Sequence, residues 1–195
     1  MSAIPPDTSS PSASSSSTPS PSTSSPSTSP SDEPATRERT VRWQSPRSVL
    51  RQAVGKSGLE LMRALLDGDL PAPPIGPTLG FRLAAVGEGT AAFELDPGEH
   101  QYNPIGSVHG GVIATVLDSA MGCAVHTTLP VGAGYTSLDL QVRFVRAVAA
   151  DTGTLVCRGE VVHVGGRTAV GEARLEDAEG RLYATGTTTC LLFRS

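Results

Sequence analysis

The sequence predicts an α+β fold in which one long, buried helix packs against an antiparallel sheet. The first observation is an apolar run from Gly111 to Leu129 that contains no proline and is too long for an ordinary strand. The second is a series of alternating segments after Gly132, joined by short turns that contain glycine. A buried helix beside hairpin-linked strands makes a two-layer architecture.

The N-terminal segment of the chain has a different composition. The first 36 residues are mostly Ser, Pro and Thr, and they hold half of the 16 prolines. Such a segment cannot bury enough apolar surface to offset its ordering entropy, so we expect residues 1–36 to be a disordered tail. Residues 37–77 are expected to be a helical segment with a Pro-rich linker, and residues 78–195 the main domain.

Two short helices are expected between residues 37 and 77. Ser45-Pro46 is typical of a helix start. Ser57-Gly58-Leu59-Glu60 fits a capping box at the start of a second helix. Pro71 to Pro77 is then predicted to be extended. The buried side of the second helix is expected to contain Leu61, Met62, Leu65 and Leu66.

Six strands are expected. Gly87-Glu88-Gly89 is predicted to be the turn of a hairpin. The expected strands run from Leu79 to Val86, Thr90 to Leu95, Tyr135 to Ala147, Thr154 to Val164, Thr168 to Leu175 and Leu182 to Phe193. In the third of these strands, alternation places one set of apolar residues on a single face: Leu138, Leu140, Val142 and Phe144.

Charge and cysteine content exclude several classes of function. The net charge is −4 without a basic block, which argues against nucleic acid as a partner. Cys123, Cys157 and Cys190 form no CxxC pair, so a reduced, cytoplasmic setting is expected. No signal peptide is visible, and Asp118 and His126 interrupt the apolar run, which favours a buried helix over a membrane span. No His–Cys spacing predicts a metal site.

The long helix contains the groups that could take part in a reaction. Gly110-Gly111 offers free backbone N–H groups and the positive end of a helix dipole. Asp118 is the single carboxylate in the apolar run, and burying it is costly unless it is paired or used. It follows His109 by nine residues, or about 14 Å of helix. Two chains with antiparallel helices could join these groups more easily than one chain, so a site shared by two subunits is predicted.

The spaced set Asn103, Gly106, His109-Gly110-Gly111 and Asp118 resembles the PaaI-like (phenylacetate-pathway) hot-dog acyl-CoA thioesterases. The segment Thr136–Phe144 is similar to the next strand of that family, and the resemblance covers roughly Leu59 to Phe193. It implies a hot-dog fold, with a curved sheet wrapped around the helix. It also implies a homodimer as the minimal unit, commonly assembled into a homotetramer. The implied activity is hydrolysis of acyl-CoA to free acid and coenzyme A without a separate cofactor.

The catalytic roles follow from the needs of thioester hydrolysis together with this resemblance. The Gly110 N–H, with the Asn103 side chain, would donate to the thioester oxygen as it gains charge. Asp118 would be the general base or the nucleophile. Ser137 would hold the attacking water, although adjacent Thr136 points to the opposite face and a one-residue shift would exchange the two. His109 is expected to orient the loop that carries Asn103.

Substrate binding and two rival functions remain open at this point. The phosphates of coenzyme A need cationic side chains or backbone N–H groups. The candidates for contact with the substrate are Gly111, Thr136, Arg143, Arg146, Gly166 and Arg167. The rival functions are a hot-dog enoyl-CoA hydratase or dehydratase and a non-catalytic module that binds acyl-CoA. Hydration of crotonyl-CoA would reveal the first, and binding without turnover the second.

Overall fold

The computed structural model describes residues 36–193, so the predicted tail lies almost entirely outside the described residues. The chain from Arg39 onward forms one compact unit. Its helical elements are α1 (Pro46–Ala53), α2 (Gly58–Leu66), α3 (Ile75–Leu79), the 3-10 helix η1 (Glu99–Gln101) and α4 (Gly110–Thr127). Its strands are β1 (Phe81–Gly87), β2 (Thr90–Leu95), β3 (Gly134–Phe144), β4 (Leu155–Val164), β5 (Thr168–Glu176) and β6 (Leu182–Phe193).

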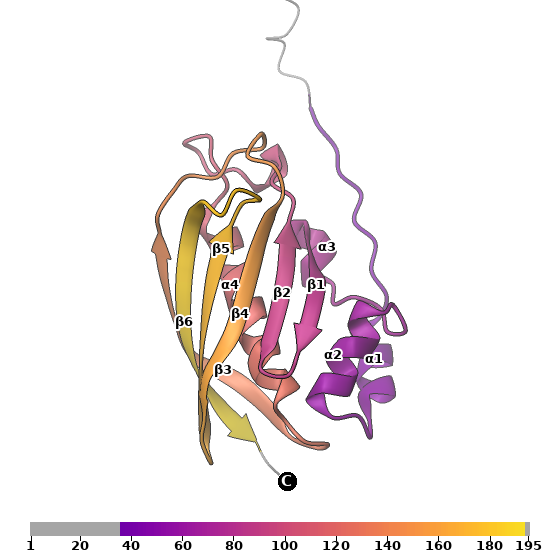
Figure 1. Ribbon diagram of the computed structural model, residues 1–195. Coiled ribbons are helices and arrows are strands. Elements are labelled where there is room, and N and C mark those ends of the chain that lie inside the picture. The colour runs from indigo at the N-terminus through magenta and orange to yellow at the C-terminus, as the bar shows by residue number, and fades with distance from the viewer. Residues whose placement is uncertain (1–35, 194–195) are drawn as a thin grey trace, which may run out of the picture. The chain divides into compact units, whose positions relative to one another are not determined.

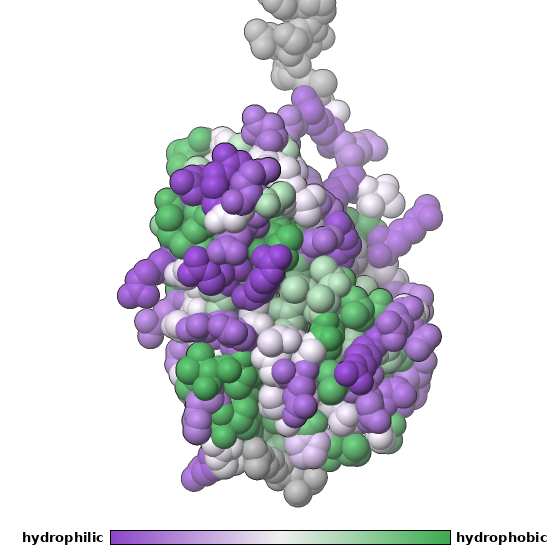
Figure 2. Space-filling model, viewed as in Figure 1, coloured by the Kyte–Doolittle hydropathy of each residue, from purple (hydrophilic) through white to green (hydrophobic). Residues whose placement is uncertain are grey.

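The six strands form one antiparallel sheet in the order β1-β2-β4-β5-β6-β3. Strands β1 and β3 are therefore its two edges. The sheet curves around α4, and α2 and α3 lie on the β1 side (Figure 1). Hydrophilic side chains cross the outer face of the sheet, as expected for its solvent side (Figure 2). The α+β prediction of one long helix against an antiparallel sheet is confirmed.

Helix α4 is buried on its sheet side and half-exposed on the other. The fully buried side chains are those of Val116, Leu117, Ala120, Met121, Ala124 and Val125. A stripe of half-exposed residues at helical spacing occupies the opposite side: Thr115, Asp118, Ser119, Cys123 and His126. Close contact with the sheet requires glycine, because a Cβ on Gly159 of β4 would lie 2.4 Å from the carbonyl carbon of Ala120.

The predicted capping box at the start of α2 is present. The Glu60 N–H donates to Ser57 Oγ at 3.3 Å, and the Ser57 N–H donates to Glu60 Oε2 at 2.7 Å. The helix then docks directly on the end of α4, because the Gly58 N–H donates to the carbonyl of Leu129 at 3.0 Å. A Cβ on Gly58 would lie 1.7 Å from the carbonyl oxygen of His126, so only glycine fits there.

The prediction of an extended linker from Pro71 to Pro77 is wrong for its last residues. Helix α3 begins at Ile75, and Pro77 lies in its first turn, where a missing N–H costs no helical hydrogen bond. Gly80 ends the helix with φ of 80°. Strand β1 consequently starts at Phe81 instead of Leu79.

Strand β3 also differs from the prediction. It ends at Phe144 rather than Ala147, and its pairing with β6 is shifted between Ser137 and Asp139. Leu138 falls in this bulge and has no partner in the ladder. The predicted apolar face is largely exposed in the single chain, with Leu138 58% and Phe144 57% exposed. An edge strand with this much exposed apolar surface is typical of an interface.

Candidate active site

Helix α4 and strand β3 bring the predicted Asp118 and Ser137 together. The Ser137 hydroxyl donates a hydrogen bond of 2.9 Å to Asp118 Oδ1. Asp118 is half-buried, and it belongs to the open stripe of α4 instead of being enclosed on all sides as the apolar run suggested. Because neighbouring strand residues point to opposite faces, Thr136 is turned away from this carboxylate. Of the predicted pair, Ser137 is therefore the residue that contacts Asp118.

The start of α4 presents one free backbone donor. His109 is the N-cap residue, and its ring Nδ1 accepts the Gly111 N–H at 2.9 Å. Among residues 36–193 the Gly110 N–H donates to no acceptor. It lies at the positive end of the helix dipole, which favours an oxygen that carries developing negative charge. The His109 ring therefore bonds to the helix start, and the Gly111 N–H is already occupied. That His109 orients the loop carrying Asn103 stays a prediction.

The Asn103 side chain holds its own loop closed. Its Oδ1 accepts the N–H groups of Ile105 and Ser107 at 3.1 and 3.2 Å. Its Nδ2 donates to Ser107 Oγ at 3.1 Å. Sequence reasoning missed Ser107, although an Asn followed by Pro and Gly is a known signal for such a side-chain-closed turn. Rotation of the amide toward a substrate would require Nδ2 to leave Ser107.

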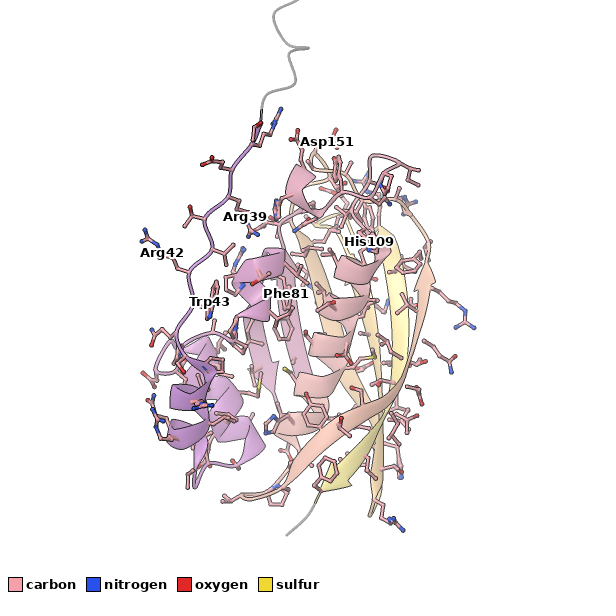
Figure 3. The ribbon with its side chains drawn as sticks, turned by 180° about the vertical axis from the view of Figure 1, so that it is seen from behind. Arg39, Arg42, Trp43, Phe81, His109 and Asp151 are labelled. Carbon is pink, nitrogen blue, oxygen red and sulfur yellow. The ribbon has the colours of Figure 1, made fainter. Side chains whose placement is uncertain are left out.

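The two halves of the predicted site stay apart in one chain. Gly110 and His109 lie at the start of α4, and Figure 3 shows His109 at that end of the helix. Asp118 lies about 14 Å further along the axis, since an α-helix rises roughly 1.5 Å per residue. A single chain therefore holds the acidic half and the N–H half at different positions along α4.

Asp118 forms part of the wall of a cavity of about 1130 Å³. Ser119, Cys123 and Tyr135 line the same region, and none of the three was predicted as a site residue. Burial, with a smaller contribution from the charge of Asp118, raises the pKa of Cys123 to about 12. Burial also raises the pKa of Tyr135. Both groups stay protonated at neutral pH, so Cys123 is not a thiolate nucleophile.

The predicted phosphate contacts do not form one cluster. Arg143 and Arg146 lie at the end of β3 that pairs with the start of β6. Gly166 and Arg167 lie in the β4–β5 turn, and the carbonyl of Arg167 accepts the N–H of Leu192 at the other end of β6. Arg146 also has local partners: its Nη1 donates to the carbonyl of Leu182 at 2.8 Å, and its guanidinium lies 5.5 Å from the centre of the Tyr183 ring.

Two further features bear on the class of site. Across residues 36–193, His, Cys, Asp and Glu side chains form no group of three that could hold a metal ion. None of the helices in that same part of the chain has both the length and the apolar character that crossing a membrane requires.

Comparisons with known proteins place the fold in one family. A family model described as the thioesterase superfamily matches residues 105–184. A candidate esterase of Halobacterium salinarum is 37% identical over 97 residues, a match that covers 46% of this chain and 62% of that relative. The chain therefore spans less than two thirds of the length of the Halobacterium protein. The 1,4-dihydroxy-2-naphthoyl-CoA hydrolase of Listeria monocytogenes is 24% identical over 105 residues, covering 54% of this chain and 84% of the relative.

A solved structure extends the likeness over most of the domain. A candidate thioesterase from Ralstonia eutropha, related to phenylacetic acid degradation, superposes with a TM-score of 0.61 and 30% sequence identity. The match covers 67% of this chain and 98% of that one. The hot-dog fold and the resemblance to thioesterases of the phenylacetate pathway are both confirmed by this comparison.

Proposed function

The chain belongs to the thioesterase superfamily, and we propose that it hydrolyses acyl-CoA thioesters to a free acid and coenzyme A in a site shared between two subunits. The observation that carries the proposal is the hydrogen bond from Ser137 to Asp118 in the wall of a cavity. A carboxylate held in place by a hydroxyl beside a cavity is what a general base or nucleophile needs. The Listeria relative, by its name a hydrolase of a CoA thioester, supports this substrate class.

The two halves of the site have different tasks in hydrolysis. The thioester oxygen accepts the Gly110 N–H, and the dipole of α4 stabilises the negative charge that develops on that oxygen. Asn103 can add a second donor when its amide turns from Ser107. Asp118 either removes a proton from the attacking water or attacks the carbonyl carbon itself, and both routes release the same thiol. Ser137 fixes the carboxylate through Oδ1 and leaves Oδ2 for that step.

The sharing of the site between subunits is supported by the shape of a single chain. Asp118 and Gly110 are too far apart along α4 to act on one carbonyl group from the same subunit. Two α4 helices in antiparallel contact would bring Asp118 of one subunit to Gly110 of the other. Strand β3 is an unpaired edge with exposed apolar residues, which supports pairing with a second copy. The exposed residues are Leu138, Leu140, Phe144 and Val145. A homodimer is the minimal unit of this proposal, and a homotetramer is its extension.

The proposed function also includes the contacts of coenzyme A and the cellular compartment. Coenzyme A enters as part of the substrate, so no separate cofactor is needed. The phosphates of coenzyme A would meet Arg143, Arg146 or the Gly166–Arg167 turn, all at exposed positions. Three free thiols, those of Cys123, Cys157 and Cys190, favour a reducing, cytoplasmic setting.

The test is thiol release from a panel of acyl-CoA substrates by the wild type, Asp118→Asn and a matched control. Asp151→Asn is that control, because Asp151 is an exposed carboxylate in the loop between β3 and β4 (Figure 3). We expect turnover by the wild type and the control, and a loss of at least about 100-fold in Asp118→Asn. Equal turnover in all three proteins contradicts the role of Asp118. Binding of acyl-CoA without turnover supports the binding module, and loss of enoyl absorbance from crotonyl-CoA supports the hydratase.

A further inference from the structure

We propose that α2, α3 and the segment 39–44 form a subsite for a long aliphatic acyl chain. This inference rests on the proposed thioesterase function and names its substrate class. The family match starts at residue 105, so this wall of the cavity lies outside the matched region. The subsite would select acyl-CoA substrates by the length of the acyl chain.

The cavity that contains Asp118 continues to the N-terminal elements. It is lined by Asp118, Ser119, Cys123 and Tyr135 of α4 and β3. Apolar side chains of α2, α3, β1 and β2 line it as well: Met62, Leu65, Ile75, Phe81, Leu83 and Phe93. Figure 3 shows Phe81 between α3 and α4. A thioester held beside Asp118 would therefore have its acyl chain directed along α2 and α3.

The size and chemistry of the space favour a long alkyl chain. Its volume of about 1130 Å³ is above the range of roughly 300–1000 Å³ that pockets for small ligands occupy. Met62 and Phe81 are 3% and 5% exposed, so buried apolar side chains form this part of the wall. Burial of methylene groups against such a wall is favourable for every carbon added to the chain. A short acyl group would leave most of this wall without contact.

The segment 39–44 also lines the cavity. The Arg39 guanidinium donates to the carbonyl oxygens of Pro77 and Thr78 at 2.6 and 2.7 Å. These carbonyls belong to the last turn of α3, where a cation also complements the helix dipole. The contact fixes the segment along α3, and Trp43 lines the cavity from this segment while its side chain is 62% exposed (Figure 3). An acyl chain in the subsite would cover part of the indole ring.

Trp43 is the single tryptophan of the chain, so its fluorescence reports occupancy of the subsite directly. The first experiment titrates the full-length protein with palmitate and, separately, with butyrate. We expect a saturable blue shift of the emission with palmitate and none with butyrate, because only the longer chain reaches the indole. Absence of a shift with palmitate, or the same shift with both acids, overturns the subsite. Neither readout depends on turnover.

The second experiment compares two neighbouring substitutions on α2. Leu65 lines the cavity, whereas Leu66 is 37% exposed and does not, so Leu65→Glu and Leu66→Glu differ mainly in whether the new charge enters the subsite. We expect Leu65→Glu to lower kcat/KM for palmitoyl-CoA by at least about tenfold. The kcat/KM for butyryl-CoA should change by less than about twofold. Palmitoyl-CoA is kept below the concentration at which it forms micelles. Leu66→Glu should leave both values near those of the wild type.

The outcomes separate the two proposals. If the wild type releases thiol from no acyl-CoA while palmitate still shifts the Trp43 emission, the thioesterase function fails and the subsite stands. If thiol release is independent of chain length and insensitive to Leu65→Glu, the subsite fails and the thioesterase function stands. Equal losses for both substrates in Leu65→Glu also overturn the subsite, because the effect of Leu65 would then not depend on the length of the acyl chain.

Discussion

The Ser137 hydroxyl of β3 donates a hydrogen bond of 2.9 Å to Oδ1 of Asp118 on α4, across 19 residues of sequence. The β3 bulge begins directly after Ser137, at the point where the strand passes the open side of the helix. The contact restricts the carboxylate to one orientation and leaves its second oxygen available. In the proposed thioesterase, this pair is the acidic half of the site, and the start of a second α4 helix supplies the other half.

Removal of the Ser137 hydroxyl should slow catalysis more than it weakens binding. In Ser137→Ala the Asp118 carboxylate loses its only hydrogen-bond donor among the described residues, so its productive orientation becomes less populated. We expect kcat to fall by about 10- to 100-fold with a small change in KM. Steady-state thiol release measures both. Thr187→Ala, at an exposed position of β6, is the control. A rise in KM with unchanged kcat in Ser137→Ala would indicate a role in binding instead.

Close packing of α4 on the sheet predicts a large loss of stability for Gly159→Ala. The added Cβ would lie 2.4 Å from a backbone carbon of Ala120, and neither backbone can move without displacing the core. We expect the free energy of unfolding to fall by about 2–4 kcal/mol, measured by urea denaturation. Gly134→Ala is the control, because its Cβ would meet Phe193 at an ordinary 3.9 Å. Equal stability of the two variants would contradict the packing of β4 on α4.

The turn between β5 and β6 predicts a pH-dependent contribution to stability. Asp177 is 6% exposed and accepts hydrogen bonds from the Arg181 N–H, the Arg181 Nε and the Tyr183 hydroxyl at 2.9, 2.6 and 3.1 Å. Burial alone would raise the pKa of Asp177, but these donors outweigh it and hold the pKa below its ordinary value. Because the folded pKa is the lower one, the stabilisation is complete above the unfolded pKa and is lost as pH falls through the folded pKa.

Asp177→Asn should therefore be less stable than the wild type near neutral pH, and the difference should shrink as the pH is lowered below about 4. Urea denaturation of both proteins between about pH 6 and pH 3 measures this difference. Asp151→Asn, at an exposed carboxylate, should differ little from the wild type at any pH. A difference between Asp177→Asn and the wild type that stays constant with pH would show that the ionised carboxylate is not what stabilises the turn.

Local sequence signals were sufficient for much of the fold and part of the site. The capping box of Ser57 and Glu60, the hairpin turn around Glu88 and the long helix that contains Asp118 all depend on neighbouring residues, and each is present in the structure. Ser137 could be chosen as a site candidate because it matches a position in a strand that resembles the family. The hydrogen bond itself depends on the tertiary packing that brings β3 beside α4.

Features set by contacts between distant segments could not be predicted in this way. The bulge at Leu138 depends on the register between β3 and β6, which no local pattern determines. Helix α3 forms among prolines that individually favour extended chain, because the first turn of a helix does not need their N–H groups. The cavity unites residues from the segment 39–44 with Asp118 and Tyr135, and only tertiary packing brings these together.

The most direct test of a shared site is complementation between two inactive variants. Asn103→Ala and Asp118→Asn are each expected to be folded and nearly inactive. When the two are co-expressed in equal amounts, random pairing gives a site with both native residues in about a quarter of cases if the residues come from different subunits. A shared site therefore predicts recovery of about a quarter of wild-type thiol release per subunit. Activity no higher than that of the separate variants would contradict a shared site, because both residues would then act from the same chain.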